Sequence, residues 1–137
     1  MSADYVPAPL RRLVHERAEE RCEYCRIHQD IFPYTHEIDH LVARKHGGQT
    51  IAENLALACI DCNRNKGSDL TSIDPITQRI FPLFNPRVQL WESHFVLEGA
   101  QIVGLTPIGR ATVFLLKIND STRISTRAAL MTAGDYP

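Results

Sequence analysis

Residues 36–67 read HEIDHLVARKHGGQTIAENLALACIDCNRNKG, and the order of patterns within this stretch decides the fold. Apolar and polar residues alternate over 37–42, which predicts a short strand. A polar loop with two glycines follows over 44–50, and residues 55–58 supply a second strand. A short helix is predicted to end near Lys66 and Gly67, because glycine commonly stops a helix. The predicted order is strand, loop, strand, helix.

The four cysteines of the chain form two identical pairs, one before this stretch and one inside it. The N-terminal residues show no secretory signal, and the cytosol keeps thiols reduced, so zinc is favoured over a disulfide or a redox pair. Two tight C-x-x-C turns can present four thiolates to one tetrahedral ion, with no coordination position left open. We therefore predict a structural Zn²⁺ site formed by Cys22, Cys25, Cys59 and Cys62.

Further helices and strands are predicted on both sides of this stretch. A first helix is predicted over 8–21, and strands are predicted over 79–84 and 94–105. The second of these stretches is expected to fold into a hairpin that turns at Glu98 and Gly99. One further helix is predicted to start at Thr106 and another to cover 122–131. The helix after Thr106 is expected to bury the apolar residues Ile108, Ala111, Phe114, Leu115 and Ile118.

Helices and strands of this kind indicate an α+β fold in which the zinc site holds the strand, loop, strand, helix unit together. With 137 residues the chain has the size of one domain, so we predict a single domain over 1–137. Its core would cover residues 8–70. Residues 71–137 would form an accessory extension, with a strand hairpin and helices packed on that core.

Composition excludes several classes of protein. Hydrophobic residues make up 44% and charged residues 23% of the chain, which is the balance of a globular protein and not of a fibrous or disordered one. Apolar runs are too short for a membrane span, so we expect a cytoplasmic protein without membrane partners. The net charge of −1 is low for a nucleic-acid binder, although 12 of the 15 basic residues are arginine. Any phosphate-binding surface must therefore be local.

A dense set of polar groups lies around the second cysteine pair. Asp39 offers the hard oxygen ligand that Mg²⁺ or Mn²⁺ prefers, and Asn63 offers a second oxygen. His40 follows Asp39 directly, and on a regular strand its side chain would point to the opposite face. One shared site therefore requires a bend at the strand end. Arg64 and Lys66 are candidates for flanking phosphates, although cations near a helix C-terminus also favour its dipole.

The combination of these motifs resembles the HNH endonucleases of the ββα-metal nuclease superfamily. The resemblance covers about a third of the chain, from Cys22 to Gly67. Its matching features are the first C-x-x-C pair, the Asp39-His40 pair, the His-Gly-Gly loop, the Asn54-Leu55 pair and the C-x-x-C-N-x-x-K-G ending.

The resemblance implies a role for each matching residue. Asp39 and Asn63 would hold one divalent cation, Mg²⁺ or Mn²⁺. His40 would be the general base that deprotonates a water molecule, and Asn54 would orient the loop that carries it. The resemblance also implies the bend that brings Asp39 and His40 to one phosphate. Imidazole suits the base role because it changes charge between pH 5 and 8.

The leading hypothesis is a metal-dependent DNA endonuclease or nickase that acts on duplex DNA. The resemblance implies 5′-phosphate and 3′-hydroxyl products. The alternative is a catalytically inactive zinc module that binds nucleic acid or a protein partner. A redox protein that uses its C-x-x-C pairs is a third hypothesis. A homodimer or a recruiting partner protein is also possible in this hypothesis, because the near-neutral charge predicts weak binding to DNA.

Overall fold

The computed structural model describes residues 5–137, so the first four residues of the predicted single domain, 1–4, lie outside the described part of the chain. The chain divides into two compact units, one that ends at Ser68 and one that begins at Asp69. Among the helices formed by residues 5–137, none combines the length and the apolar character needed to cross a membrane.

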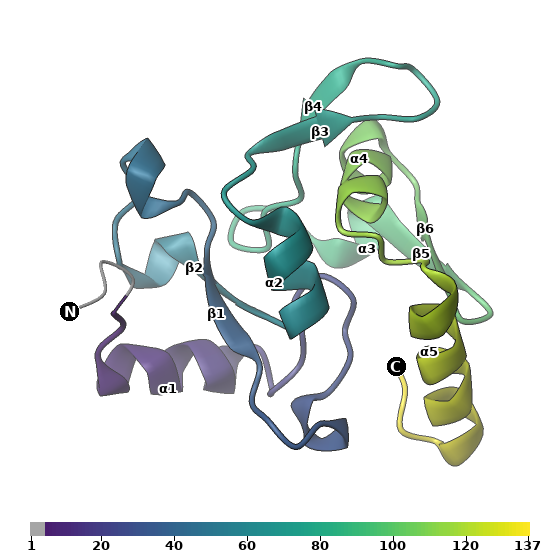
Figure 1. Cartoon of the computed structure of the whole chain (residues 1–137), viewed down its shortest axis with the longest axis horizontal. Coiled ribbons are helices and arrows are strands. Elements are labelled where there is room, and N and C mark those ends of the chain that lie inside the picture. The colour runs from purple at the N-terminus through teal and green to yellow at the C-terminus, as the bar shows by residue number, and fades with distance from the viewer. Residues whose placement is uncertain (1–4) are drawn as a thin grey trace. The chain divides into compact units, whose positions relative to one another are not determined.

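The first unit contains the predicted strand, loop, strand, helix order (Figure 1). Its elements are α1 (Ala8–Arg17), β1 (Glu37–His40), β2 (Leu55–Ala58), α2 (Ile60–Lys66) and the short 3-10 turns Gln29–Ile31, Arg44–His46 and Ala52–Asn54. Strands β1 and β2 are antiparallel, with Glu37 opposite Ala58 and Asp39 opposite Ala56. The mixed α+β fold with a ββα core is confirmed.

The alternating residues of β2 give the small sheet two different faces. Leu55 and Leu57 are fully buried and belong to an apolar cluster with Val14 of α1. Ala56 and Ala58 are also fully buried and share the other face with their partners on β1, because side chains alternate along a strand. Helix α2 contacts both strands. The sheet is therefore held between an apolar layer on α1 and a polar layer on α2.

Helix α1 is shorter than the predicted helix over 8–21. It ends at Arg17, and Glu19 and Glu20 adopt the left-handed backbone conformation with φ of 55° and 61°. Two such residues cannot continue a right-handed helix. The chain then turns back, and Cys22 donates its amide to the carbonyl of Ile27. The helix stops early because the following residues build the first cysteine turn.

The second unit contains two two-stranded sheets and three helices. Its elements are β3 (Thr71–Ile73), β4 (Ile80–Pro82), α3 (Trp91–His94), β5 (Phe95–Glu98), β6 (Gln101–Gly104), α4 (Pro107–Leu115) and α5 (Ser121–Ala133). The hairpin predicted at Glu98 and Gly99 is present, with Gly99 at φ +59°. The Thr106 hydroxyl accepts a hydrogen bond from the amide of Gly109 at 3.1 Å, which caps α4 as predicted.

One predicted core residue of this unit is wrong. Phe114 is 54% exposed, whereas Ala111, Thr112 and Leu116 are fully buried. The reason is a close backbone approach: a Cβ at Gly109 would lie 2.1 Å from the carbonyl oxygen of His94. Glycine and alanine on α4 therefore face the hairpin, and this rotation turns Phe114 outward.

Candidate functional site

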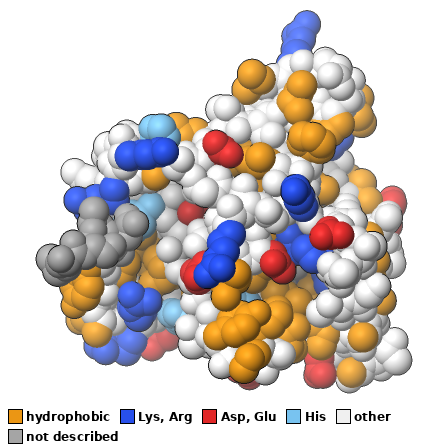
Figure 2. All heavy atoms as spheres, in the orientation of Figure 1, with side chains coloured by type: hydrophobic (Ala, Val, Ile, Leu, Met, Phe, Trp, Pro, Cys, Tyr) orange, Lys and Arg blue, Asp and Glu red, His pale blue; other side chains and the backbone are white. Residues whose placement is uncertain are grey.

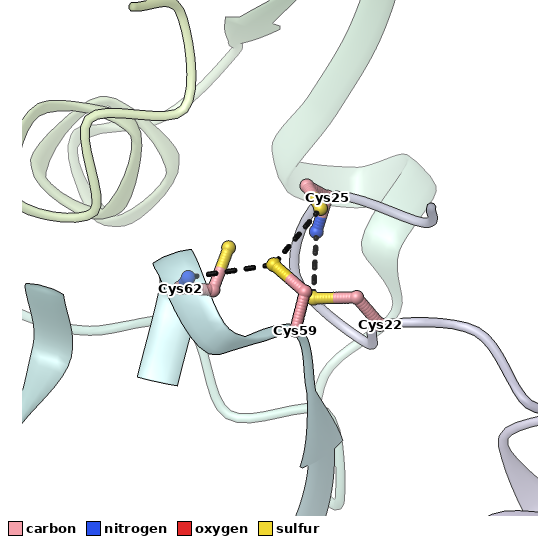
Figure 3. Close-up of side chains that lie close together, drawn as sticks. All are labelled: Cys22, Cys25, Cys59 and Cys62. Carbon is pink, nitrogen blue, oxygen red and sulfur yellow. Dashed lines mark hydrogen bonds between the residues drawn. The ribbon is translucent and has the colours of Figure 1, made fainter. Parts of the chain in front are cut away.

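The four cysteine side chains converge on one point. Figure 3 shows the sulfurs of the first turn facing those at the start of α2. All four sulfur atoms lie within 4.8 Å of one another and all four residues are buried. The distance between Sγ of Cys25 and Sγ of Cys59 is 3.7 Å. The fold thus brings together two pairs that are separated by 33 residues in the sequence.

The two cysteine turns have the same local geometry. In each turn the backbone amide of the second cysteine donates a hydrogen bond to the sulfur of the first, at 3.4 Å. Cys59 is also the N-cap residue of α2, so the positive end of the helix dipole points towards its sulfur. Amide donors and a helix N-terminus favour negative charge on sulfur, which is the state that binds a metal ion.

The donor set fits a zinc ion. Four sulfurs held at about 2.3 Å from a tetrahedral Zn²⁺ lie about 3.8 Å from one another, which agrees with the 3.7 Å between Cys25 and Cys59. Burial raises the pKa of the Cys62 thiol, and hydrogen bonds from the Cys59 thiol to Cys22 and Cys25 raise the pKa of Cys59, so four thiolates need a cation to offset their charge. The four predicted cysteines are confirmed to be positioned to form a zinc site.

A pocket of about 880 Å³ opens beside the polar face of the sheet. Its lining brings together four of the predicted site residues, Asp39, His40, Asn63 and Arg64. The complete lining is Glu37, Ile38, Asp39, His40, Ala43, Arg44, Lys45, Asn63, Arg64, Gly67 and Ser68. Asp39 and His40 thus reach one pocket despite the alternation of side chains along β1, because His40 is the last residue of the strand.

Asp39 has a partner on each carboxylate oxygen. The hydroxyl of Tyr24 donates to Oδ2 at 2.7 Å, and Nζ of Lys66 donates to Oδ1 at 3.1 Å. Only 3% of Asp39 is exposed. Burial raises the pKa of Asp39, and the charge of Lys66 opposes this rise. The carboxylate is therefore fixed in orientation and partly neutralised before any cation binds.

Lys66 lies inside the domain and not at its surface. Its side chain is 2% exposed, and its ammonium contacts Asp39 as well as the carbonyl oxygens of His40 and Leu41, at 3.3 and 3.4 Å. It does not line the pocket. The phosphate role expected from sequence does not match this position, because the three donors of the ammonium are directed at the end of β1.

Asn63 and Arg64 share one acidic partner. Nδ2 of Asn63 donates to Oε1 of Glu37 at 3.0 Å, and a guanidinium nitrogen of Arg64 lies 3.5 Å from Oε2. Since the amide nitrogen of Asn63 is used by Glu37, its oxygen is the group that is left for a cation. The Arg64 side chain is 71% exposed, so its charge remains accessible to a phosphate.

His40 contacts the loop that follows its strand. Its Nε2 lies 2.9 Å from the hydroxyl oxygen of Thr50, and a guanidinium nitrogen of Arg44 donates to the same oxygen at 3.1 Å. Thr50 therefore occupies Nε2 of His40, and Nδ1 is the ring nitrogen that this contact leaves available. His40 is 8% exposed and lines the pocket, so the arrangement can supply a proton acceptor there.

Asn54 clamps the same loop through three hydrogen bonds. Its Oδ1 accepts from the amide of Val42 at 2.9 Å, and its Nδ2 donates to the carbonyls of Val42 and Gln49 at 3.0 and 2.9 Å. Gly48 packs under this clamp: a Cβ there would lie 1.7 Å from the carbonyl oxygen of Val42. Two residues of the sequence motif thus act together to set the path of the chain after His40.

This packing predicts different effects for the two glycines of the loop. Gly48→Ala forces the Val42 carbonyl away from Asn54, so we expect it to lower the free energy of unfolding by about 1–3 kcal/mol. It should also speed hydrogen exchange at the Val42 amide, which Asn54 otherwise protects. Gly47→Ala is the matched control, because its φ of +91° costs about 1–2 kcal/mol but no atom obstructs its Cβ. Equal exchange at Val42 in both variants would contradict the clamp.

Three residues around the candidate site were given no role from the sequence. Glu37 belongs to the polar set around the second cysteine pair, and its position two residues before Asp39 places both on one face of β1. No sequence pattern indicated a role for Thr50 or Tyr24. Their contacts with His40 and Asp39 depend on the path of the loop and of the first cysteine turn.

Charges around the pocket are mixed. Glu37 and Asp39 face the basic residues Arg44, Lys45 and Arg64 along its lining. On the face drawn in Figure 2, the described Lys and Arg side chains are likewise interspersed with Asp and Glu side chains. The pocket therefore offers three basic side chains beside its two carboxylates, on a chain with a net charge of −1.

Comparison with known proteins adds one independent finding. Residues 22–69 match the family model described as HNH endonuclease, which covers the cysteine turns, both strands of the ββα core and helix α2. No curated protein and no solved structure matches the chain. The matched segment contains both the cysteine cluster and the residues of the pocket. Residues 22–69 therefore form a domain of the HNH endonuclease family, with four cysteines positioned to form a zinc site.

Proposed function

We propose that this domain hydrolyses phosphodiester bonds of DNA with the help of one divalent cation. The observation that carries the proposal is the shared pocket of Asp39, His40 and Asn63 in a segment that matches a nuclease family. Asp39 and the amide oxygen of Asn63 are the residues that would hold Mg²⁺ or Mn²⁺. When bound, the cation supplies charge stabilisation on the phosphate and on the leaving oxygen.

Each remaining residue has a defined task in this proposal. His40 takes the proton from the attacking water, and Thr50 orients its ring. Asn54 holds the loop that follows His40. Lys66 neutralises Asp39 instead of binding a phosphate. A zinc ion on the four cysteines maintains the fold without taking part in the reaction, because four thiolates leave it no open position.

Arg64 is proposed to bind a phosphate next to the cleaved bond, so its loss should lower the affinity for DNA. Its exposed guanidinium lines the pocket, so Arg64→Ala should weaken binding of duplex DNA and lower the slope of log affinity against log salt by about 1. Binding is measured by fluorescence anisotropy in buffer without Mg²⁺, so that no cleavage occurs.

The control for this prediction is Arg12→Ala. Arg12 is also exposed in the first unit, but it lies on α1 and does not line the pocket. Its loss should leave the salt slope unchanged. If both variants change the slope equally, the DNA is bound elsewhere on the surface.

A second candidate function is an inactive zinc module that binds nucleic acid or a protein partner. The observation in its favour is that both carboxylate oxygens of Asp39 already have partners within the chain. Incubation of zinc-loaded protein with supercoiled plasmid and Mg²⁺ or Mn²⁺ separates the two functions. The nuclease converts supercoiled plasmid to the open circular or linear form, whereas the inactive module leaves it supercoiled and retards it on a gel only if its partner is nucleic acid.

A further inference from the structure

Tyr24 connects the cysteine cluster to the candidate cation site. It lies between Cys22 and Cys25 in the first cysteine turn, and its side chain is fully buried. Its hydroxyl donates a hydrogen bond of 2.7 Å to Oδ2 of Asp39. One side chain thus spans the space between the two sites.

The backbone on either side of Tyr24 is fixed to the rest of the domain. Glu23 donates its amide to the carbonyl of Leu57 at 2.8 Å, and its carboxylate accepts from the amide of Leu57 at 2.9 Å. Leu57 in turn pairs with Ile38, the neighbour of Asp39 on β1. The first cysteine turn is therefore attached to the sheet beside the strand that carries Asp39.

The contacts of Asp39 leave it able to bind a cation. A carboxylate has about four lone pairs, of which Tyr24 and Lys66 each use one, on different oxygens. These two donors prevent rotation of the carboxylate plane, while at least one lone pair of each oxygen stays free of them. A carboxylate that is already oriented binds a metal ion without losing rotational freedom.

We propose that Tyr24 is a positioning residue that orients Asp39 for the divalent cation and thereby couples the zinc site to the cation site. This inference rests on the proposed function, because it assigns Tyr24 to the cation that the nuclease would use. It gives the first cysteine turn a second task besides stability. Loss of order in this turn moves the hydroxyl of Tyr24, and the affinity for the second cation then falls.

The test is Tyr24→Phe in the zinc-loaded full chain, with Mn²⁺ binding followed by electron paramagnetic resonance of the free ion. Loss of a partner that orients a metal ligand commonly weakens metal affinity about 10–100-fold, and we expect a decrease of that size. Tyr34→Phe is the matched control, because Tyr34 is 47% exposed, stacks on Phe32 and is not one of the two hydrogen-bond partners of Asp39. Both variants should retain the zinc content of the wild type.

Catalysis provides a second readout of positioning. In plasmid nicking, the Mn²⁺ concentration for half-maximal rate should rise in Tyr24→Phe by the same factor as the dissociation constant, while the rate at saturating Mn²⁺ changes much less. Unchanged Mn²⁺ affinity in Tyr24→Phe, or loss of its zinc, overturns the inference. Absence of Mn²⁺ binding and nicking in the wild type overturns the proposed function instead, so the two failures are distinguishable.

A measurement on the unmutated residue covers the case in which Tyr24→Phe does not fold. Zinc-loaded protein is labelled with 3-fluorotyrosine, and the four ¹⁹F signals are assigned with Phe variants of Tyr5, Tyr34 and Tyr136. We expect Mg²⁺ to shift the Tyr24 signal and to leave the Tyr34 signal in place. The Mg²⁺ concentration at the midpoint of this shift should equal the midpoint of Mg²⁺ binding. A Tyr24 signal that does not respond to saturating Mg²⁺ overturns the inference.

Discussion

Replacing His40 by alanine is expected to lower the rate of plasmid nicking about 100- to 10,000-fold, the usual contribution of a positioned base. The variant should fold normally, because its backbone pairing with Leu55 does not involve the side chain. The lost hydrogen bond is the 2.9 Å contact with the Thr50 hydroxyl. Rates are measured with zinc-loaded protein at saturating Mg²⁺, and folding is checked by circular dichroism.

His46→Ala is the matched control for this prediction. His46 is exposed in the same loop but does not line the pocket, so its loss should leave the nicking rate unchanged. Equal nicking by wild type and His40→Ala would show that another residue, or a contaminating nuclease, performs the reaction. Loss of activity in both variants would indicate damage to the loop and not loss of a base.

The second large effect is expected for stability. Structural zinc sites contribute about 10–16 kcal/mol of apparent metal-binding free energy in small peptides, whereas whole domains are stable by about 5–15 kcal/mol. Cys59→Ser removes one of four converging sulfurs and also the sulfur that accepts the Cys62 amide. We expect this variant to lose zinc and to lose the cooperative thermal transition of the first unit. Circular dichroism melting and metal analysis of the purified protein measure both effects.

Asp61→Ser controls for the position of the substitution. Asp61 lies in the same turn, between Cys59 and Cys62, but it is exposed and carries no sulfur. It should retain zinc and lose at most about 1 kcal/mol through the helix dipole. A Cys59→Ser protein that melts like the wild type and nicks plasmid would contradict a stabilising role for the cluster.

The fold of the first unit follows from local sequence patterns. The second strand was predicted with the bounds that the structure gives it, because Leu55 and Leu57 alternate with alanines between two turn signals. The spacing of each cysteine pair predicted its turn, and four such residues imply one tetrahedral site. Local spacing was sufficient for these features because each is decided within a few residues.

Long-range packing decided the features that the sequence did not reveal. Lys66 looks like any exposed lysine near a helix end, and only the path of β1 places a buried carboxylate and two carbonyls within its reach. Phe114 continues an apolar stripe, yet the contact of Gly109 with His94 turns it outward. The link between Tyr24 and Asp39 joins residues 15 positions apart. Such contacts depend on how the elements pack, which spacing does not encode.

The position of the cysteines also constrains when a newly made chain can acquire its metal. The ribosome releases a protein from its N-terminus onwards, and Cys59, Cys62 and Asn63 leave it well after Cys22 and Cys25. Until then, neither the sulfur cluster nor the pair of oxygen donors is complete. Completion of the sulfur cluster and of the oxygen-donor pair therefore waits for the same short stretch, from Cys59 to Asn63 at the start of α2.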